Sequence, residues 1–381
     1  MTYQVIARKF RPQVFEDLIG QQHVTRTLCN AIEQGRIPHA FLFTGTRGVG
    51  KTSAARVLAK ALVCEQGPTP RPCNLCEHCR SITAGNHLDV FEIDGASNRG
   101  IDEIRDLREK IAYMPSKARF KLYIIDEVHM LTSEAFNALL KTLEEPPEHV
   151  KFIFATTEAH KIPSTILSRC QRFDFRKIGV GLIVDRLVDI CEREGVGAER
   201  SVLTTIAREA GGSMRDAQSL LDQVISFSGG NLGGAGLSEL LGLHDQGKVL
   251  ILLRALFEGE LPRAFTLLRE IDEAGHDFGR FLLALIETLK DLIVLSVAGE
   301  AGAESLDRTA EELVELRSLA GLRSTGEVEL INDLFLRGHQ LLHGFEHPRL
   351  LLEILAYKAV LVDGLIPIED LVQSVREKKK T

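Results

Sequence analysis

The chain has 381 residues, 44% hydrophobic and 26% charged, which is typical of a soluble globular protein of two or three domains. Its 46 Lys and Arg against 53 Asp and Glu give a formal charge of −7, which argues against a protein coated in basic surface. Any contact with nucleic acid then has to come from a local patch. The most apolar stretch, residues 281–297, contains Glu287, Lys290 and Asp291, so we expect a buried helix there and no contact with a membrane. The odd number of cysteines, seven, and the lack of an apolar signal segment predict a cytoplasmic protein.

An apolar run at residues 41–43 leads into the pattern Gly-x-x-x-x-Gly-Lys-Thr at 45–52 and then into a helix-forming segment. This strand–loop–helix context is the one that a phosphate-binding loop requires, and the alternative is a chance glycine turn before a helix. The glycines allow backbone N–H groups to approach an oxyanion, Lys51 can reach the β- and γ-phosphates, and the Thr52 hydroxyl can bind Mg²⁺. We therefore predict that ATP is held by Gly45, Thr46, Arg47, Gly48, Val49, Gly50, Lys51, Thr52 and Ser53.

Two further apolar segments end in polar side chains suited to the same site. Residues 121–125 end in Asp126 and Glu127, and residues 151–155 end in Thr156 and Thr157. We expect Asp126 to hold Mg²⁺ and Glu127 to orient the attacking water, although a strand merely capped by acids is the alternative. Ligands of open α/β sheets bind at the carboxyl ends of the strands, so one of the two threonines is expected to sense the γ-phosphate or position water.

Four cysteines are spaced Cys64-x₈-Cys73-x₂-Cys76-x₂-Cys79 in a segment interrupted by glycine and prolines. Four thiolates suit a tetrahedral, structural Zn²⁺, and such an ion contributes about 10–16 kcal/mol of apparent binding free energy in small zinc modules. His78 is a competing ligand. Disulfides, which a reducing compartment disfavours, and free thiols are the alternatives.

Residues 1–38 precede the phosphate loop and allow two interpretations. They can form a solvated arm with Phe10 and Phe15 in the core, or a wall on which adenine stacks, and the composition favours neither. The residues of the predicted adenine wall are Ala7, Arg11, Pro12 and Ile19.

The segment 89–113 is expected to form a short strand at 89–94, a loop at 95–100 and an amphipathic helix from 101. Ser97, Asn98 and Arg99 stand where that helix begins, and backbone amides there can hold a DNA phosphate. Ordinary N-capping by Ser97 or Asn98 is the alternative. Further on, Arg169 lies at a turn before the last expected strand, where it can form a surface salt bridge of little energetic value.

After residue 178 the strand pattern disappears and helices are expected, one of them capped by Ser213. Residues 243–368 are Leu-rich and helical in character, and 369–381 form a charged tail.

These motifs together resemble those of the ATPase subunits of the bacterial DNA polymerase III clamp loader, the gamma/tau (DnaX) family of AAA+ proteins. The resemblance is dense over residues 1–220, and beyond them it is one of length and helical character. The segments that match the family are 3–9, 45–52, the four cysteines, 125–130, 137–147, 166–170 and 212–217.

The resemblance implies an α/β AAA+ domain with a parallel sheet at residues 1–178, into which the four-Cys zinc module is inserted at about 64–79. A helical lid would follow at 179–242 and an all-α collar for oligomerisation at 243–368.

A nucleotide site between subunits is also implied. Thr156 or Thr157 matches the first sensor of the family, Arg215 matches the second sensor, and Arg169 matches an arginine finger that acts on ATP in the neighbouring subunit. Such fingers stabilise transition-state charge and are worth about 10³–10⁵ in rate.

The partners implied are subunits of the delta and delta-prime types, further copies of this chain, a sliding clamp, and primer–template DNA held by its phosphate backbone near Ser97 and Asn98. The setting is the nucleoid-associated replisome, where the ATPase acts within the DNA polymerase III holoenzyme. A non-hydrolysing scaffold subunit of the delta-prime type is a second hypothesis, and the intact residues 50–52 and 126–127 favour the motor over it. A hexameric AAA+ DNA translocase is a third, and it would not need the four-Cys insertion.

Overall fold

The structure is a computed structural model that describes residues 4–97, 111–228, 231–232, 244–306, 308, 310–342, 344–345 and 347–362. The chain divides into two compact units, Met1–Leu237 and Ser238–Thr381, which we describe separately. Asn98, Arg99, most of the helix expected from residue 101 and the charged tail lie outside the described residues. Within the described part, no helix has the length and apolarity needed to cross a lipid bilayer.

The first unit is built on a five-stranded sheet with the strand order β2-β3-β4-β1-β5. All neighbouring strands are parallel, which confirms the predicted sheet. Because β1 and β3 both flank β4, the loops that follow these three strands meet at one edge of the sheet. The strands are β1 (Ala40–Thr44), β2 (Val90–Asp94), β3 (Lys121–Asp126), β4 (Val150–Thr156) and β5 (Gln171–Asp174).

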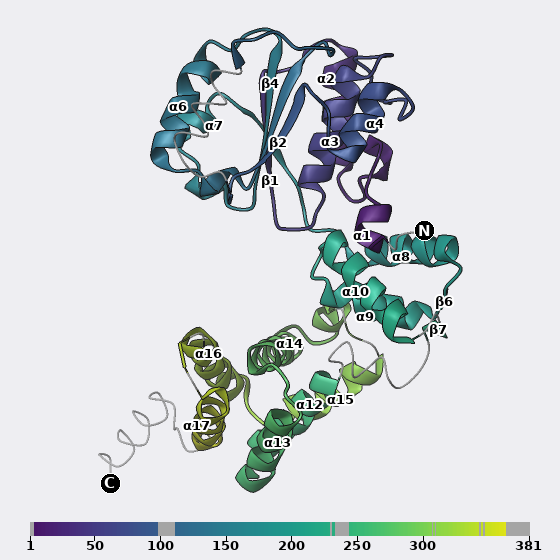
Figure 1. The fold of residues 1–381 in the computed structure, drawn as a ribbon. Helices are drawn as coiled ribbons and strands as arrows, with labels where there is room; N and C mark the ends of the chain where they lie inside the picture. Colours follow the sequence, from purple (N-terminus) through teal and green to yellow (C-terminus); the bar gives the residue numbers. More distant parts are fainter. Residues whose placement is uncertain are drawn as a thin grey trace, which may run out of the picture. The chain divides into compact units, whose positions relative to one another are not determined.

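Helices cover both faces of this sheet (Figure 1). Helices α2 (Gln22–Glu33) and α3 (Lys51–Val63) lie on one face, and α6 (Ser133–Glu144) and α7 (Ser164–Leu167) lie on the other. The alternation of side chains along β1 explains this arrangement, because Phe41 and Phe43 pack on the α3 side while Leu42 packs on the α6 side.

The N-terminal segment contains α1 (Ile6–Lys9) and the 3₁₀ turn η1 (Phe15–Asp17). Phe15 is buried in the core beneath α3, as the first of the two interpretations of this segment has it, whereas Phe10, which that interpretation also places in the core, is only half-buried. Helix α1 packs against α10 of the following helical domain. The segment is therefore a folded part of the first unit.

Three helices follow the sheet: α8 (Val180–Glu194), α9 (Arg200–Glu209) and α10 (Met214–Ser228). Ser213 caps α10, as predicted, because its Oγ accepts a hydrogen bond from Asp216 N at 3.2 Å. The expectation of helices alone was wrong in one detail. Strands β6 (Gly197–Ala198) and β7 (Asn231–Leu232) form a parallel pair, and two-residue strands are too short to leave an alternating pattern in the sequence.

All described elements of the second unit are helices, as predicted, and they share one apolar core. Residues 281–297 fall in the long helix α14, where Phe281, Leu285 and Leu289 are fully buried while Val297 is exposed. The helices are α12 (His244–Phe257), α13 (Leu261–Glu273), α14 (Phe278–Ser305), α15 (Ala310–Ala320), α16 (Thr325–Leu342) and α17 (Pro348–Leu361).

Candidate nucleotide and metal sites

The loop between β1 and α3 needs its glycines for two reasons. Gly45, Gly48 and Gly50 have φ values of 142°, 78° and 106°, which side chains rarely adopt. There is also no space for a Cβ atom, which would stand 2.4 Å from the carbonyl oxygen of Phe175 at position 45 and 1.8 Å from Ser213 Oγ at position 48. The loop is thus enclosed by the end of the sheet on one side and by the start of α10 on the other.

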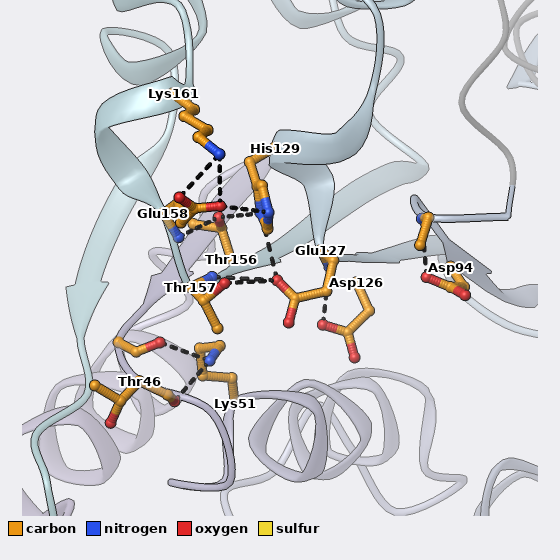
Figure 2. A network of polar contacts seen from close by, with 12 residues as sticks. Thr46, Lys51, Asp94, Asp126, Glu127, His129, Thr156, Thr157, Glu158 and Lys161 are labelled. Carbon is orange, nitrogen blue, oxygen red and sulfur yellow. Dashed lines mark hydrogen bonds and ion pairs between the residues drawn. The ribbon is translucent and has the colours of Figure 1, made fainter. Parts of the chain in front are cut away.

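Lys51 begins α3 and bends back over this loop (Figure 2). Its ammonium donates hydrogen bonds to the carbonyl oxygens of Gly45 at 2.7 Å and Thr46 at 2.8 Å. The side chain is buried, and burial lowers the pKa of Lys51, although the nearby carboxylates of Glu127 and Asp126 act in the opposite direction. The ammonium is therefore held beside the two acidic residues predicted to complete the site.

The oxygens predicted to bind Mg²⁺ lie together. Thr52 Oγ1 donates to Asp126 Oδ2 at 2.6 Å, so a hydroxyl and a carboxylate converge at one point beside the loop. Mg²⁺ prefers oxygen ligands and is usually bound by one or two carboxylates plus phosphate oxygens. The residues present therefore fit a magnesium ion at this position.

Glu127 follows β3 in a left-handed backbone conformation, with φ of 46°. This conformation costs of the order of 1–3 kcal/mol for a residue other than glycine and persists only where the surroundings hold it. Here Glu127 Oε2 accepts hydrogen bonds from Thr157 N at 3.3 Å and from Thr157 Oγ1 at 3.1 Å. Of the two threonines at the end of β4, Thr157 is thus the one that contacts the predicted water-orienting carboxylate.

A histidine to which the sequence analysis gave no role connects these groups (Figure 2). His129, in the 3₁₀ turn η2 (Val128–Met130), has its Nδ1 3.0 Å from Thr156 Oγ1 and 3.3 Å from Glu127 Oε2. Its Nε2 lies 3.0 Å from Glu158 Oε2, and Lys161 Nζ lies 2.9 Å from the same carboxylate. Two sequence signals could have identified His129: its position three residues after Asp126, and its place in segment 125–130, which matches the family.

A cavity of about 770 Å³ opens beside the loop. Every residue of the predicted adenine wall lines it, as do residues 47–53, Asp126, Glu127 and Arg215. Gly45 and Thr46 do not line the cavity; they provide the carbonyl groups that bind Lys51. The cavity also has lining residues that the sequence analysis missed: Val5, Arg8, Phe10, Asp17, Leu18, Ile178, Arg186, Met214, Gln218 and Ser219.

Arg11 illustrates the electrostatics of this cavity. Burial lowers the pKa of its guanidinium, and the nearby charges of Arg56 and Arg215 lower it further. Its Nε donates to Ser53 Oγ at 3.2 Å, which ties the N-terminal segment to the first turn of α3. The site is therefore rich in positive charge before any ligand binds, as expected for a receptor of a polyphosphate.

The two arginines predicted as sensor and finger occupy different positions. Arg215 is in the first turn of α10, lines the cavity, and donates its backbone N–H to the Gly48 carbonyl at 3.3 Å. Arg169 does not line the cavity of its own chain. Its guanidinium donates to Glu144 Oε1 and to the Thr165 carbonyl, both at 2.8 Å, so the ion pair considered in the sequence analysis is present.

The four predicted cysteine ligands come together between α3 and α4 (Glu77–Ala84). Their sulfurs all lie within 4.8 Å of one another, and the sulfurs of Cys64 and Cys73 are 3.6 Å apart. A tetrahedral ion with zinc–sulfur bonds of about 2.3 Å needs sulfurs separated by about 3.8 Å, so the cluster fits zinc. All seven cysteines are among the described residues and none forms a disulfide. His78 is outside the cluster, because its Nδ1 lies 2.8 Å from His87 Nε2.

Backbone N–H groups prepare one of these thiols for metal binding. Leu75 N and Cys76 N lie 3.5 Å and 3.3 Å from Cys73 Sγ, and these hydrogen bonds lower the pKa of Cys73 to about 6. A thiolate is the form that binds zinc. Burial instead raises the pKa of Cys64 and Cys79, and a bound cation would oppose that shift.

Of the predicted DNA-contacting residues, only Ser97 is described. Its Oγ donates to Asp94 Oδ2 at 2.8 Å in the turn after β2. Asn98 and Arg99 lie outside the described residues, so the contact with DNA remains a prediction.

Three family models match successive parts of the chain. They are described as the delta subunit of DNA polymerase III, at residues 20–179, the ATPase lid domain of the DNA polymerase III clamp loader subunit, at 182–230, and domain III of the DNA polymerase III subunits gamma and tau, at 234–375. The gamma subunit of Buchnera aphidicola subsp. Schizaphis graminum is 38% identical over 94% of this chain and 99% of its own length. The chain belongs to the gamma/tau family of DNA polymerase III subunits. The family predicted from the motifs is thus confirmed, as is the predicted fold class.

Two further comparisons concern the length of a related protein and the similarity to a solved structure. The tau subunit of Bacillus subtilis is 46% identical over 94% of this chain, which spans 63% of the length of that protein. Among solved structures, the RuvB Holliday junction branch migration motor of Thermotoga maritima has a TM-score of 0.46 and 16% identity, covering 70% of this chain and 86% of its own. That score is too low to bear on the function of this chain.

Proposed function

We propose that this chain is an ATP-driven clamp-loader subunit, in which ATP bound and hydrolysed at subunit interfaces opens a sliding clamp and loads it onto primer–template DNA. The observation that carries the proposal is the convergence of Lys51, the Thr52–Asp126 pair and Arg215 on one cavity. Membership of the gamma/tau family supports it. The domains proposed are an AAA+ domain at 1–178, a helical lid at 179–242 and a collar at 243–368, followed by a charged tail.

Nucleotide binding requires Lys51 to exchange its partners. Its ammonium now donates to two loop carbonyls, and phosphate oxygens would replace them as acceptors. Backbone N–H groups of the loop and the first turn of α3 would hold the same phosphates, while Arg11, Pro12 and Ile19 would receive the base. Mg²⁺, held by Thr52 and Asp126, would neutralise charge on the phosphates.

Hydrolysis would use groups from two protomers. Glu127 would orient the attacking water, and Thr157, which contacts its carboxylate, would position it. Arg215 would contact the nucleotide from the lid. Arg169 does not line the cavity of its own chain, and it would leave its ion pair with Glu144 to act on ATP bound by a neighbour.

The partners proposed are clamp-loader subunits of the delta and delta-prime types, further copies of this chain, the clamp, and DNA held through its phosphates. The cysteine cluster would bind one structural zinc ion. A non-hydrolysing scaffold is disfavoured, because the residues needed for phosphate and metal binding are all present and close together.

The test compares Lys51→Ala with Lys117→Ala, a matched variant of an exposed lysine that precedes β3 and lies outside the cavity. We expect Lys51→Ala to abolish ATP binding in calorimetry and to remove ATPase activity from the assembled complex with clamp and primed DNA. Lys117→Ala should retain both ATP binding and ATPase activity. Normal ATP affinity in Lys51→Ala would refute the assignment of the loop, and an isolated chain that hydrolyses ATP as fast as the complex would refute the shared site.

A further inference from the structure

A second cavity, of about 280 Å³, adjoins the first, because Arg8, Arg11 and Pro12 line both. The N-terminal segment, α3 and the carboxyl end of α4 enclose it. Four of its lining side chains are cationic, namely Arg8, Arg11, Arg56 and Lys60, and no acidic side chain among the described residues lines it. A cavity whose charged lining side chains are all cations attracts an anion.

Three of these cations retain guanidinium nitrogens that make no hydrogen bond to protein in the described structure. Arg11 uses only its Nε, on Ser53, and the guanidinium of Arg8 is exposed and has no ion pair there. Arg56 gives Nε and Nη2 to Glu92 and keeps Nη1. Three guanidinium groups from residues that line one cavity suit an anion with several oxygens.

The negative groups nearby do not balance this charge. Glu92 offsets one charge through its pair with Arg56. Lys60 is buried, donates to the uncharged oxygens of Gln13 at 2.5 Å and Asn74 at 2.9 Å, and has Cys79 beside it. Asp17 also acts on Lys60 and Asp126 on Arg11, in each case as the smallest of the electrostatic influences. If the charge of Lys60 is assigned to the cysteine cluster and Asp17, three guanidinium groups still face two carboxylates, Glu92 and Asp126. The carboxyl end of α4 adds only about half a negative charge.

We propose that this second cavity binds a phosphate group. A cluster of Arg side chains favours the tetrahedral, multi-oxygen phosphate over a single carboxylate, and the volume accommodates an anion as large as pyrophosphate. A free phosphate compound and a DNA backbone present this same phosphate chemistry, and the experiment below distinguishes them. The site is distinct from the phosphate loop, because Lys51 and the loop glycines do not line it.

The decisive variants change a residue that lines only this cavity. Ala84, the last residue of α4, is exposed and does not line the larger cavity, so Ala84→Glu adds a carboxylate to the second cavity and Ala84→Gln adds the same volume without charge. Both are placed in the full chain with Lys51→Ala, so that the phosphate loop does not bind the probe. The probe is pyrophosphate, and its binding is measured by calorimetry.

We expect the Lys51→Ala chain to bind pyrophosphate and Ala84→Glu to weaken that binding by about tenfold or more, the effect of losing one charge-assisted hydrogen bond. Ala84→Gln should change the affinity for pyrophosphate by less than about threefold. Arg56→Gln should also weaken it about tenfold, whereas Arg26→Gln, an exposed arginine on α2, should not. Absence of pyrophosphate binding in Lys51→Ala at low millimolar concentration, or equal losses in Ala84→Glu and Ala84→Gln, would overturn the proposal.

A duplex-DNA arm identifies the source of the phosphate. If Ala84→Glu weakens binding to DNA and reduces the slope of affinity against salt by about one, the group belongs to a DNA backbone. If Ala84→Glu weakens only pyrophosphate binding, the group belongs to a free phosphate compound. Binding of a glutamate-rich peptide in preference to both probes would overturn the assignment to phosphate. Each result is independent of the proposed ATPase activity, which requires Lys51.

Discussion

Replacing Gly48 with alanine should push the start of α10 away from the phosphate loop. At φ of 78°, alanine costs about 1–2 kcal/mol in a left-handed conformation. Its Cβ would also stand 1.8 Å from Ser213 Oγ and 2.9 Å from Ser213 Cβ, and overlap of this kind typically costs about 1–3 kcal/mol as the neighbours shift. Gly48→Ala should therefore destabilise the first unit by about 2–5 kcal/mol.

The overlap part of that cost should be reversible by a second substitution. Ser213→Gly removes both atoms that the new methyl group meets, and as an exchange at a helix N-cap it costs only a few tenths of a kcal/mol. The double variant should therefore be more stable than Gly48→Ala alone by about 1–3 kcal/mol, although Ser213→Gly by itself destabilises. Ser213→Gly would thus destabilise the wild type but stabilise Gly48→Ala, and this reversal is specific evidence of contact between the loop and α10.

The assay is calorimetric melting of the nucleotide-free full chain, with ADP affinity measured in parallel. ADP affinity should fall in Gly48→Ala, because Arg215 is displaced together with α10, and should recover in part in the double variant. If Ser213→Gly lowers the stability of Gly48→Ala further, with no recovery of stability in the double variant, α10 does not rest on Gly48. Our account of a loop enclosed by the start of α10 is then wrong.

Three other predictions concern separate regions. Arg169→Ala should preserve ATP affinity but reduce turnover of the assembled complex by about 10³-fold or more, and unchanged turnover would exclude a finger acting in trans. Metal analysis should find one zinc per chain, lost in Cys73→Ser but retained in the matched Cys29→Ser, which lies outside the cluster; a folded, zinc-free wild type would contradict this. Burial alone would raise the pKa of Asp89, but hydrogen bonds from three backbone N–H groups hold that pKa below 3.8. Because that pKa is depressed in the folded state, the stabilisation is present above pH 3.8 and is lost as the pH falls through the folded value. Asp89→Asn should thus cost roughly 1.5–3 kcal/mol at neutral pH, and urea titrations should show the difference shrinking in acid; a difference independent of pH would contradict this.

Features that depend on short spacings could be predicted from the sequence. The phosphate loop and the cysteine cluster each lie within one short segment, so the residue pattern alone determines which groups can meet. The parallel sheet was predicted from the resemblance to AAA+ proteins, and the alternation of buried strands with helical segments agrees with it. Asp126 and Thr157 were placed at the same edge because the carboxyl ends of parallel strands lie together.

Contacts across long sequence separations could not be predicted in this way. Nothing near Gly48 indicates that Ser213 lies against it, because that contact depends on how three helices pack after the sheet is complete. The same holds for Arg186 and Gln218, which line the cavity from the lid. His129 was missed for a different reason, since a single histidine after an acidic pair has many possible roles until its neighbours are known.

The internal hydrogen bonds of the site determine what a nucleotide has to replace. Lys51 is satisfied by two loop carbonyls, and Glu127 is satisfied by Thr157. Each bond given up offsets part of the gain from a new bond to phosphate or water, so the net affinity is smaller than a count of new contacts suggests. Because the Gly48 carbonyl also holds the start of α10, the loop cannot rearrange around phosphates without affecting the position of Arg215. Occupancy of the loop and the position of the lid are therefore energetically linked within one protomer.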